Sequence, residues 1–167
     1  MVYLFRRGQS AREGAGRAFP LLWVTADLAV AGAPAPRDWA TLRRAGICSV
    51  LDLRAEAADD LRLLEGFGRG YIRFPIVEGA APTPEQLSAM VQWVAARIPS
   101  GPVLAHCREG RGRSPLAAAA TLVYLGFSVA DAYQMVRRAQ PLAELSPEQA
   151  RALESFGLSR ALRKGGG

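Results

Sequence analysis

Apolar and polar residues alternate along this chain in segments whose length and spacing predict a mixture of strands and helices. Short runs rich in Val, Ile and Leu have the length of buried strands, and longer stretches between them carry apolar residues at helical spacing. In 85–98, for example, Leu87, Met90, Val94 and Ile98 recur every three or four residues. The predicted strands are 21–30 (with an internal turn), 47–53, 71–77 and 103–105. The predicted helices are 38–44, 57–65, 85–98, 116–125, 129–138 and a last one that begins after Ser146.

The order of these elements predicts the architecture. Strands alternate with helices in the first part of the chain, and helices follow one another in the last part. We therefore expect a three-layer α/β/α fold, with a central, mostly parallel sheet of about four to five strands flanked by helices. Pro75 restricts its strand to an edge or a strand end. The length of 167 residues suits one domain, which we assign to 21–163. Residues 1–20, rich in Arg and Gly, are expected to be a flexible basic arm.

The most informative stretch is 103–125, a predicted strand, a tight loop and a predicted helix. Ser114 is the expected N-cap, and Pro115 suits the first helical position because it has no N–H to leave unpaired. The first amides of a helix lack partners, and the helix dipole adds positive charge there. Gly110 and Gly112 let the loop turn its amides towards one centre. The stretch therefore predicts a cradle for an anion.

Two side chains give this cradle a chemical character. Cys107 stands at its start, where the amides and nearby guanidinium groups stabilise a thiolate. Arg113 stands at its end and can hold two oxygens of a phosphate in a bidentate fork, which a lysine cannot do. The pattern predicts a site that binds a tetrahedral oxyanion beside a sulfur nucleophile.

His106-Cys107, five residues and then Arg113-Ser114 resembles the signature loop of cysteine-based protein tyrosine phosphatases, and the single-domain, dual-specificity branch is the most similar. Support extends over 22–158, because a helix, Gly-Ile and a strand that ends in Asp-Leu-Arg resemble the N-terminal half of the same enzymes. The resemblance implies hydrolysis of phosphate monoesters through a cysteinyl-phosphate.

The resemblance also implies roles for single residues. Cys107 is the expected nucleophile, and Ser114 is expected to hydrogen-bond the sulfur and help it leave in the second step. His106 is expected to support the loop through hydrogen bonds; a role as general base is the less favoured alternative. Gln149 resembles a glutamine that orients water in part of the family. The expected phosphate-binding residues are Arg108, Glu109, Gly110, Arg111, Gly112 and Arg113.

The general acid is the point at which the chain departs from the family. The family uses an Asp on a mobile loop upstream of the cysteine, and that loop matches 75–82 here. Glu78 stands where the Asp is expected, with the same functional group on a side chain one methylene longer. We take Glu78 as the candidate acid, with Asp59, Asp60 and Glu144 as competitors.

Composition narrows the possible partners. The net charge is +6, which favours anionic substrates. No nucleic-acid partner is expected, because the arginines are scattered among carboxylates without an aromatic-basic motif. No run is long and apolar enough for membrane insertion, and the first residues are too short for a secretion signal. One histidine and two distant cysteines do not make a metal site, so we expect no metal and no cofactor. We expect a monomer.

The two cysteines bear on the compartment. They form no framework of pairs, so we expect a reducing, cytoplasmic location, which a free catalytic thiol also requires. Cys48 is expected to fill core space. The alternative, a disulfide between Cys48 and Cys107 that shields the nucleophile from over-oxidation, is left open.

Several substrates and functions remain open from sequence alone. A phosphotyrosine protein is the first choice, and the absence of pocket-deepening insertions predicts a shallow site that also accepts phosphoserine and phosphothreonine. Arg108 and Arg111 resemble basic loop positions of phosphoinositide phosphatases, which makes a phosphoinositide or inositol polyphosphate the second choice, although Glu109 offsets part of that charge. A phosphate-binding module without turnover and a rhodanese-type sulfurtransferase are alternatives from other classes.

Overall fold

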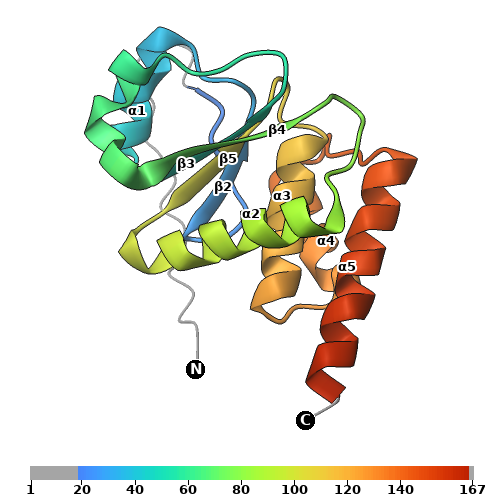
Figure 1. The fold of residues 1–167 in the computed structure, drawn as a ribbon. Helices are drawn as coiled ribbons and strands as arrows, with labels where there is room; N and C mark the ends of the chain where they lie inside the picture. The colour runs from blue at the N-terminus through green and yellow to red at the C-terminus, as the bar shows by residue number, and fades with distance from the viewer. Residues whose placement is uncertain (1–18, 166–167) are drawn as a thin grey trace.

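The computed structural model describes residues 19–165 and contains one five-stranded sheet with helices on both faces (Figure 1). The strand order is β1-β2-β5-β3-β4; β1 is antiparallel to β2, and the other neighbouring strands are parallel. The predicted α/β/α class with a mostly parallel sheet is thus confirmed. The elements are β1 (Leu22–Trp23), β2 (Leu28–Ala31), η1 (Pro36–Asp38), α1 (Trp39–Arg44), β3 (Ser49–Arg54), η2 (Leu61–Gly70), β4 (Tyr71–Ile76), α2 (Pro84–Arg97), η3 (Ile98–Ser100), β5 (Val103–His106), α3 (Arg113–Leu125), α4 (Val129–Ala139) and α5 (Pro147–Gly165).

The central strands are buried on both faces, which explains why their sequences are mostly apolar and do not alternate with exposed polar residues. Successive side chains of a strand point to opposite faces. Leu51 and Leu53 accordingly belong to the core shared with α2 and α3, whereas Val50 belongs to the core under α1 and η2. Figure 1 shows α1 and η2 on one side of the sheet and α2 to α5 on the other.

Local sequence signals account for several elements. Pro75 lies in β4, which is an edge strand, so its missing N–H costs no ladder hydrogen bond. Thr83 caps α2 by accepting a hydrogen bond from the Gln86 amide, and Ser128 caps α4 in the same way.

The predicted helix 57–65 is wrong, because residues 55–60 form a loop and a 3-10 segment, η2, follows. The side chain of Asp60 caps η2 by accepting from the amide of Arg62, so the helical segment starts later than expected. Gly66, Gly68 and Gly70 then disfavour a regular α-helix, because glycine loses the most backbone entropy on ordering.

The prediction for Ser114 as N-cap is also wrong. Helix α3 starts two residues earlier than that prediction requires, at Arg113, and its N-cap residue is Gly112, which has no side chain to donate or accept. Ser114 lies in the first turn and is fully buried. Its hydroxyl is thereby free to face the loop instead of the helix amides.

The two cysteines are free and differ in their surroundings. Cys48 is exposed, so the expectation that it fills core space is wrong, whereas Cys107 is buried. Cys48 precedes β3 and Cys107 follows β5. Because these neighbouring strands are parallel, the two thiols lie at opposite ends of the strands. The geometry therefore overturns the disulfide alternative.

Most of the predicted N-terminal arm, residues 1–18, lies outside the described residues. Within 19–165, no helix combines the length and the apolar character that a bilayer-spanning segment needs.

The four parallel strands end at one edge of the sheet. Their last residues are Ala31 in β2, His106 in β5, Arg54 in β3 and Ile76 in β4. The segments that follow these strands therefore meet there, which is where open α/β sheets usually bind ligands.

Candidate active site

The loop between β5 and α3 turns its carbonyl groups outward. The carbonyl oxygen of Arg108 accepts from the Ala33 amide at 3.1 Å, and that of Arg111 accepts from the Glu144 amide at 2.8 Å. The carbonyl of Gly110 accepts from Nε2 of Gln140 at 3.0 Å. With these carbonyls held by donors outside the loop, the loop amides are left to face its centre.

Cys107 lies at that centre. Its Sγ accepts from the Gly110 amide at 3.3 Å and lies 3.4 Å from Oγ of Ser114, with 3% of the residue exposed. The amide, the hydroxyl and the start of α3 surround the sulfur with hydrogen-bond partners and the positive end of a helix dipole. The structure thus brings together the predicted nucleophile and its predicted hydroxyl partner.

The hydroxyl of Ser114 has two possible acceptors. Its Oγ lies 3.3 Å from the carbonyl oxygen of Ala31, as well as 3.4 Å from the sulfur of Cys107. A hydroxyl has one proton, so it can donate to only one of them at a time. Ser114 is therefore placed to switch its donated hydrogen bond to the sulfur when negative charge develops there.

Gly110 is required by the close approach of β2 to the loop. Its φ is 74°, and a Cβ there would lie 2.6 Å from the carbonyl carbon of Ala31. A side chain at this position would be strained and would push the loop away from the sheet. Gly112 instead leaves room for a neighbour, because a Cβ would come within 3.2 Å of Oε1 of Gln149.

Arg113 is buried and held in one orientation. Its Nη1 and Nη2 donate to the two carboxylate oxygens of Glu56 at 2.7 Å each, and Nη1 also donates to the Ile76 carbonyl at 2.9 Å. A guanidinium has five N–H groups, and these bonds use three. The remaining two, on Nε and Nη2, lie along one edge of the group and form a fork for two phosphate oxygens.

Glu56 is the site residue that sequence reasoning missed. It lies in 52–60, a stretch that also contains Asp52, Asp59 and Asp60. Nothing in the sequence distinguishes Glu56 from these carboxylates. The hydrogen bonds from Arg113 lower the pKa of Glu56 to about 2. Because this pKa is depressed, the pair stabilises the fold above pH 4.5, and that contribution is lost as the pH falls through about 2.

Glu78 lies at the mouth of the loop, in a turn after β4. Its Oε2 lies 3.5 Å from Nη1 of Arg108, and both side chains are more than half exposed. The turn is tied to the start of α5, because the Gly79 carbonyl accepts from Oγ of Ser146 at 2.6 Å. Glu78 is therefore an accessible carboxylate on a segment anchored beside the loop.

Gln149 is fully buried rather than solvated, with 2% exposed. Its Nε2 donates to the Ala80 carbonyl at 3.1 Å, and its Oε1 accepts from the Ser146 amide at 3.1 Å. Gln149 thus joins the Glu78 turn, the start of α5 and the phosphate loop next to Gly112. The second N–H of Nε2 and the second lone pair of Oε1 are left for a water-orienting role.

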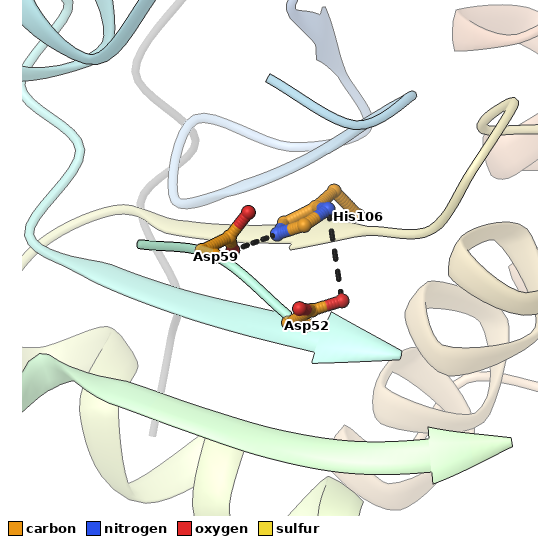
Figure 2. A group of neighbouring side chains, drawn as sticks. All are labelled: Asp52, Asp59 and His106. Atoms are coloured by element: carbon orange, nitrogen blue, oxygen red, sulfur yellow. Dashed lines mark hydrogen bonds and ion pairs between the residues drawn. The ribbon is translucent and has the colours of Figure 1, made fainter. Parts of the chain in front are cut away.

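His106 faces away from the cradle into a buried carboxylate network, shown in Figure 2. Its Nε2 lies 2.8 Å from Oδ2 of Asp59, and its Nδ1 lies 4.0 Å from Oδ1 of Asp52. This agrees with the expected supporting role of His106, but the partner is the loop after β3.

Arg54 completes the network as its cation. It donates to Asp52 through Nε and Nη2, both at 2.9 Å, and to Asp59 through Nη2 at 2.6 Å. Burial raises the pKa of Asp52, but the bonds from Arg54 and the charge of His106 outweigh it and hold that pKa below its ordinary value. Asp52, Asp59 and His106 offer ligand atoms within 4.8 Å of one another, yet the guanidinium already occupies both carboxylates. We therefore do not assign a metal there.

These contacts bear on the competing acids. Asp59 is held by His106 and Arg54, with only 3% of its side chain exposed. Asp60 is exposed and pairs with Arg62 at 2.7 Å. Glu144 is exposed and meets the loop through its backbone amide. Glu78 remains the candidate acid because its carboxylate is both accessible and beside a loop residue.

The network predicts a stability effect for Asp59→Asn. The change leaves the buried Arg54 with one carboxylate instead of two, and loss of a buried partner costs about 3 kcal/mol. Thermal or urea unfolding measures it. Asp60→Asn is the matched control, because that pair is exposed at the surface and Asn also caps a helix. Equal unfolding midpoints for wild type and Asp59→Asn would contradict the network.

Comparison with known proteins gives consistent matches. A family model described as a polymorphic toxin system DSP-PTPase phosphatase matches residues 25–127. Human dual specificity phosphatase 28 is 29% identical over 147 residues, which cover 83% of this chain and 80% of the human protein.

Solved structures agree in fold. The active form of Tk-PTP superposes with a TM-score of 0.76 at 29% identity, covering 83% of this chain and 97% of Tk-PTP. PTPMT1 in complex with PI(5)P gives a TM-score of 0.76 over 84% of this chain and 96% of its own, but at 19% identity it supports the fold alone.

Proposed function

The chain belongs to the DSP-PTPase family of dual-specificity phosphatases, and we propose that it hydrolyses phosphotyrosine, phosphoserine and phosphothreonine monoesters through a cysteinyl-phosphate on Cys107. The observation that carries this proposal is the position of Sγ, which faces the Gly110 amide and the Ser114 hydroxyl at the start of α3. The family assignment favours a phosphatase over the two alternatives, a sulfurtransferase and a phosphate-binding module without turnover.

In the first step, the thiolate of Cys107 attacks phosphorus. An S–P bond forms, the P–O bond to the leaving group breaks, and the electron pair of that bond goes to the leaving oxygen. Glu78, protonated at this stage, gives its proton to that oxygen. The amides of the loop and the Nε–Nη2 edge of Arg113 stabilise the equatorial oxygens, in positions that are fixed before substrate binds.

In the second step, water attacks the cysteinyl-phosphate. Glu78, now ionised, takes a proton from the water, and the S–P bond breaks to release inorganic phosphate. The electron pair returns to sulfur, and the hydroxyl of Ser114 turns from the Ala31 carbonyl to the developing thiolate. The covalent route divides one difficult displacement into two easier ones.

The substrate class depends on the mouth of the site. Arg108, Glu109 and Arg111 are all exposed around it, and Arg108 pairs with Glu78. We propose a shallow mouth that accepts three types of phosphorylated side chain. A phosphoinositide or inositol polyphosphate is the second candidate, favoured by the two exposed arginines, which can bind further phosphate groups.

The remaining expectations are kept as proposals. We infer that 21–163 forms the phosphatase domain and that the protein acts as a monomer. The cytoplasm is the proposed location because Cys107 must stay a free thiol in order to react.

Phosphate release from a matched substrate panel tests the substrate assignment. The panel contains phosphotyrosine, phosphoserine and phosphothreonine forms of one peptide, together with PI(5)P in micelles. All are assayed with a reducing agent and excess chelator, because thiolate chemistry needs no metal. We expect turnover of all three peptides at higher kcat/KM than PI(5)P. The opposite order would favour the phosphoinositide candidate.

Glu78→Gln tests the proposed acid. A glutamine cannot transfer the proton, and we expect kcat for a phosphoserine peptide to fall about 10²-fold. The effect on para-nitrophenyl phosphate should be much smaller, because its leaving group needs little protonation. Glu109→Gln is the control, since that carboxylate is also exposed at the loop. Equal loss with both substrates would contradict an acid role for Glu78.

A further inference from the structure

A groove of about 570 Å³ lies between α2 and α5, outside the phosphate loop. Helix α5 contributes residues at positions 151, 152, 155, 156, 159, 160 and 163, which is the spacing of one continuous helix face. Pro84 on α2, Tyr124 on α3 and Phe156 on α5 supply apolar surface, and the buried Leu87 lies beneath them. The groove is therefore formed where α2 and α5 pack side by side on α3.

The charge of this groove is one-sided. Arg151, Arg160 and Arg163 line it, and no carboxylate does so among the described residues. Ser88, Ser155, Ser159 and Gln92 add hydroxyl and amide groups that can hydrogen-bond a ligand backbone. The lining combines apolar, polar and positively charged groups, which fits an anionic ligand with apolar parts.

Arg160 is held in place before any ligand arrives. Its guanidinium lies over the Tyr124 ring, with Cζ 4.4 Å from the ring centroid, and Nη2 donates to the Tyr124 carbonyl at 2.9 Å. Its Nε is buried and finds no acceptor within residues 19–165. The protein therefore uses only part of this group's donor capacity.

The arginines are too far apart for one small anion. Arg151 and Arg163 are separated by twelve residues of α5, which corresponds to about 18 Å along the helix axis. An extended chain covers that distance with about six residues. Leu158 and Leu162 extend the apolar surface beyond the rim, with 69% and 79% exposed. The spacing favours a polypeptide with several negative charges over a single headgroup.

Two other occupants of the groove, residues 1–18 of the same chain and a second copy of the chain, are unfavourable. Residues 1–18 contain four arginines and one glutamate, so they would bring like charge to the groove. A second copy of the chain in a symmetric contact through this face would place Arg151 and Arg163 near the same residues of its partner. Both cases set positive charge against positive charge.

We propose that the α2–α5 groove is a docking site for an acidic segment of a partner protein, in which apolar residues are flanked by Asp or Glu side chains. The apolar residues pack on Pro84 and Phe156, and the carboxylates pair with the arginines. Pro82, which also lines the groove, belongs to the segment that follows Glu78. A docked segment therefore leads towards the active-site mouth.

Binding of a labelled peptide to the full chain tests the proposal without any turnover, so its failure is distinct from failure of the phosphatase proposal. The probe is a fluorescein-labelled dodecapeptide of Glu and Leu, measured by anisotropy. We expect saturable binding that Arg151→Glu/Arg163→Glu weakens at least about tenfold. Arg160 is left unchanged because it packs on Tyr124.

Two controls separate docking from general charge attraction. Arg44→Glu/Arg137→Glu changes the net charge equally at exposed positions outside the groove and should leave the affinity within about twofold. A Glu and Ser peptide should bind more weakly than the Glu and Leu peptide. The proposal is overturned if the peptide does not bind, if both double variants weaken it equally, or if the leucines make no difference. Binding of phosphatidylserine vesicles in place of the peptide would also overturn it, in favour of a membrane surface.

Discussion

Cys107→Ser is expected to lower kcat/KM for para-nitrophenyl phosphate about 10⁴-fold or more, because a hydroxyl at this position is a far weaker nucleophile than a thiolate. The Gly110 amide and the start of α3 face this position, but a serine hydroxyl placed there is a weak nucleophile at its ordinary pKa. Serine has nearly the same size as cysteine, so the buried loop should keep its shape. Initial rates in excess chelator measure the effect.

The chain contains its own matched control for this experiment. Cys48 is the second cysteine. It is exposed and lies at the opposite end of the parallel strands from Cys107. Cys48→Ser should therefore keep the wild-type rate. Equal unfolding midpoints for wild type and Cys107→Ser would assign the lost activity to chemistry rather than folding. Substantial turnover by Cys107→Ser would contradict a cysteine nucleophile.

Arg113→Lys is expected to lower kcat/KM about 10³-fold although the charge is kept. The arginine binds Glu56 and the Ile76 carbonyl with three N–H groups and keeps two more on one edge for the phosphate. A lysine ammonium cannot hold the carboxylate, the carbonyl and two phosphate oxygens in these directions at once. The largest loss should be in kcat, because the fork matches the oxygens of the transition state.

Arg111→Lys is the control for Arg113→Lys, since Arg111 is exposed on the same loop and contributes its backbone to the cradle. We expect its kcat/KM to stay within about twofold of wild type. Steady-state kinetics with phosphotyrosine peptide measure both variants. Similar losses in the two variants would contradict a specific role for the fork of Arg113.

Sequence reasoning found the parts of the site whose signal is local. The strand, the glycine-containing loop and the helix start are adjacent in the chain, so Cys107, Arg113 and Ser114 could be placed together without knowing the fold. The caps that Thr83 and Ser128 form in the structure are equally local, because each accepts from the amide three positions further on.

The parts that sequence reasoning missed depend on contacts between distant segments. Glu56 meets Arg113 across 57 positions, and Asp59 meets His106 across 47. Both acidic residues look like ordinary loop carboxylates until β3 and β5 are paired. The helix predicted for 57–65 failed for a related reason, because Asp59 is drawn into the buried network and Asp60 caps the next segment.

The most direct test of the central claim is to trap the covalent intermediate. Ser114→Ala removes the hydroxyl 3.4 Å from Sγ and should slow the second step more than the first, so that phosphoenzyme accumulates. The variant is mixed with para-nitrophenyl phosphate, quenched within one turnover and analysed by peptide mass spectrometry. We predict one added phosphoryl group, located on Cys107. Release of para-nitrophenol in the same quench without any phosphoryl group on Cys107 would contradict the mechanism.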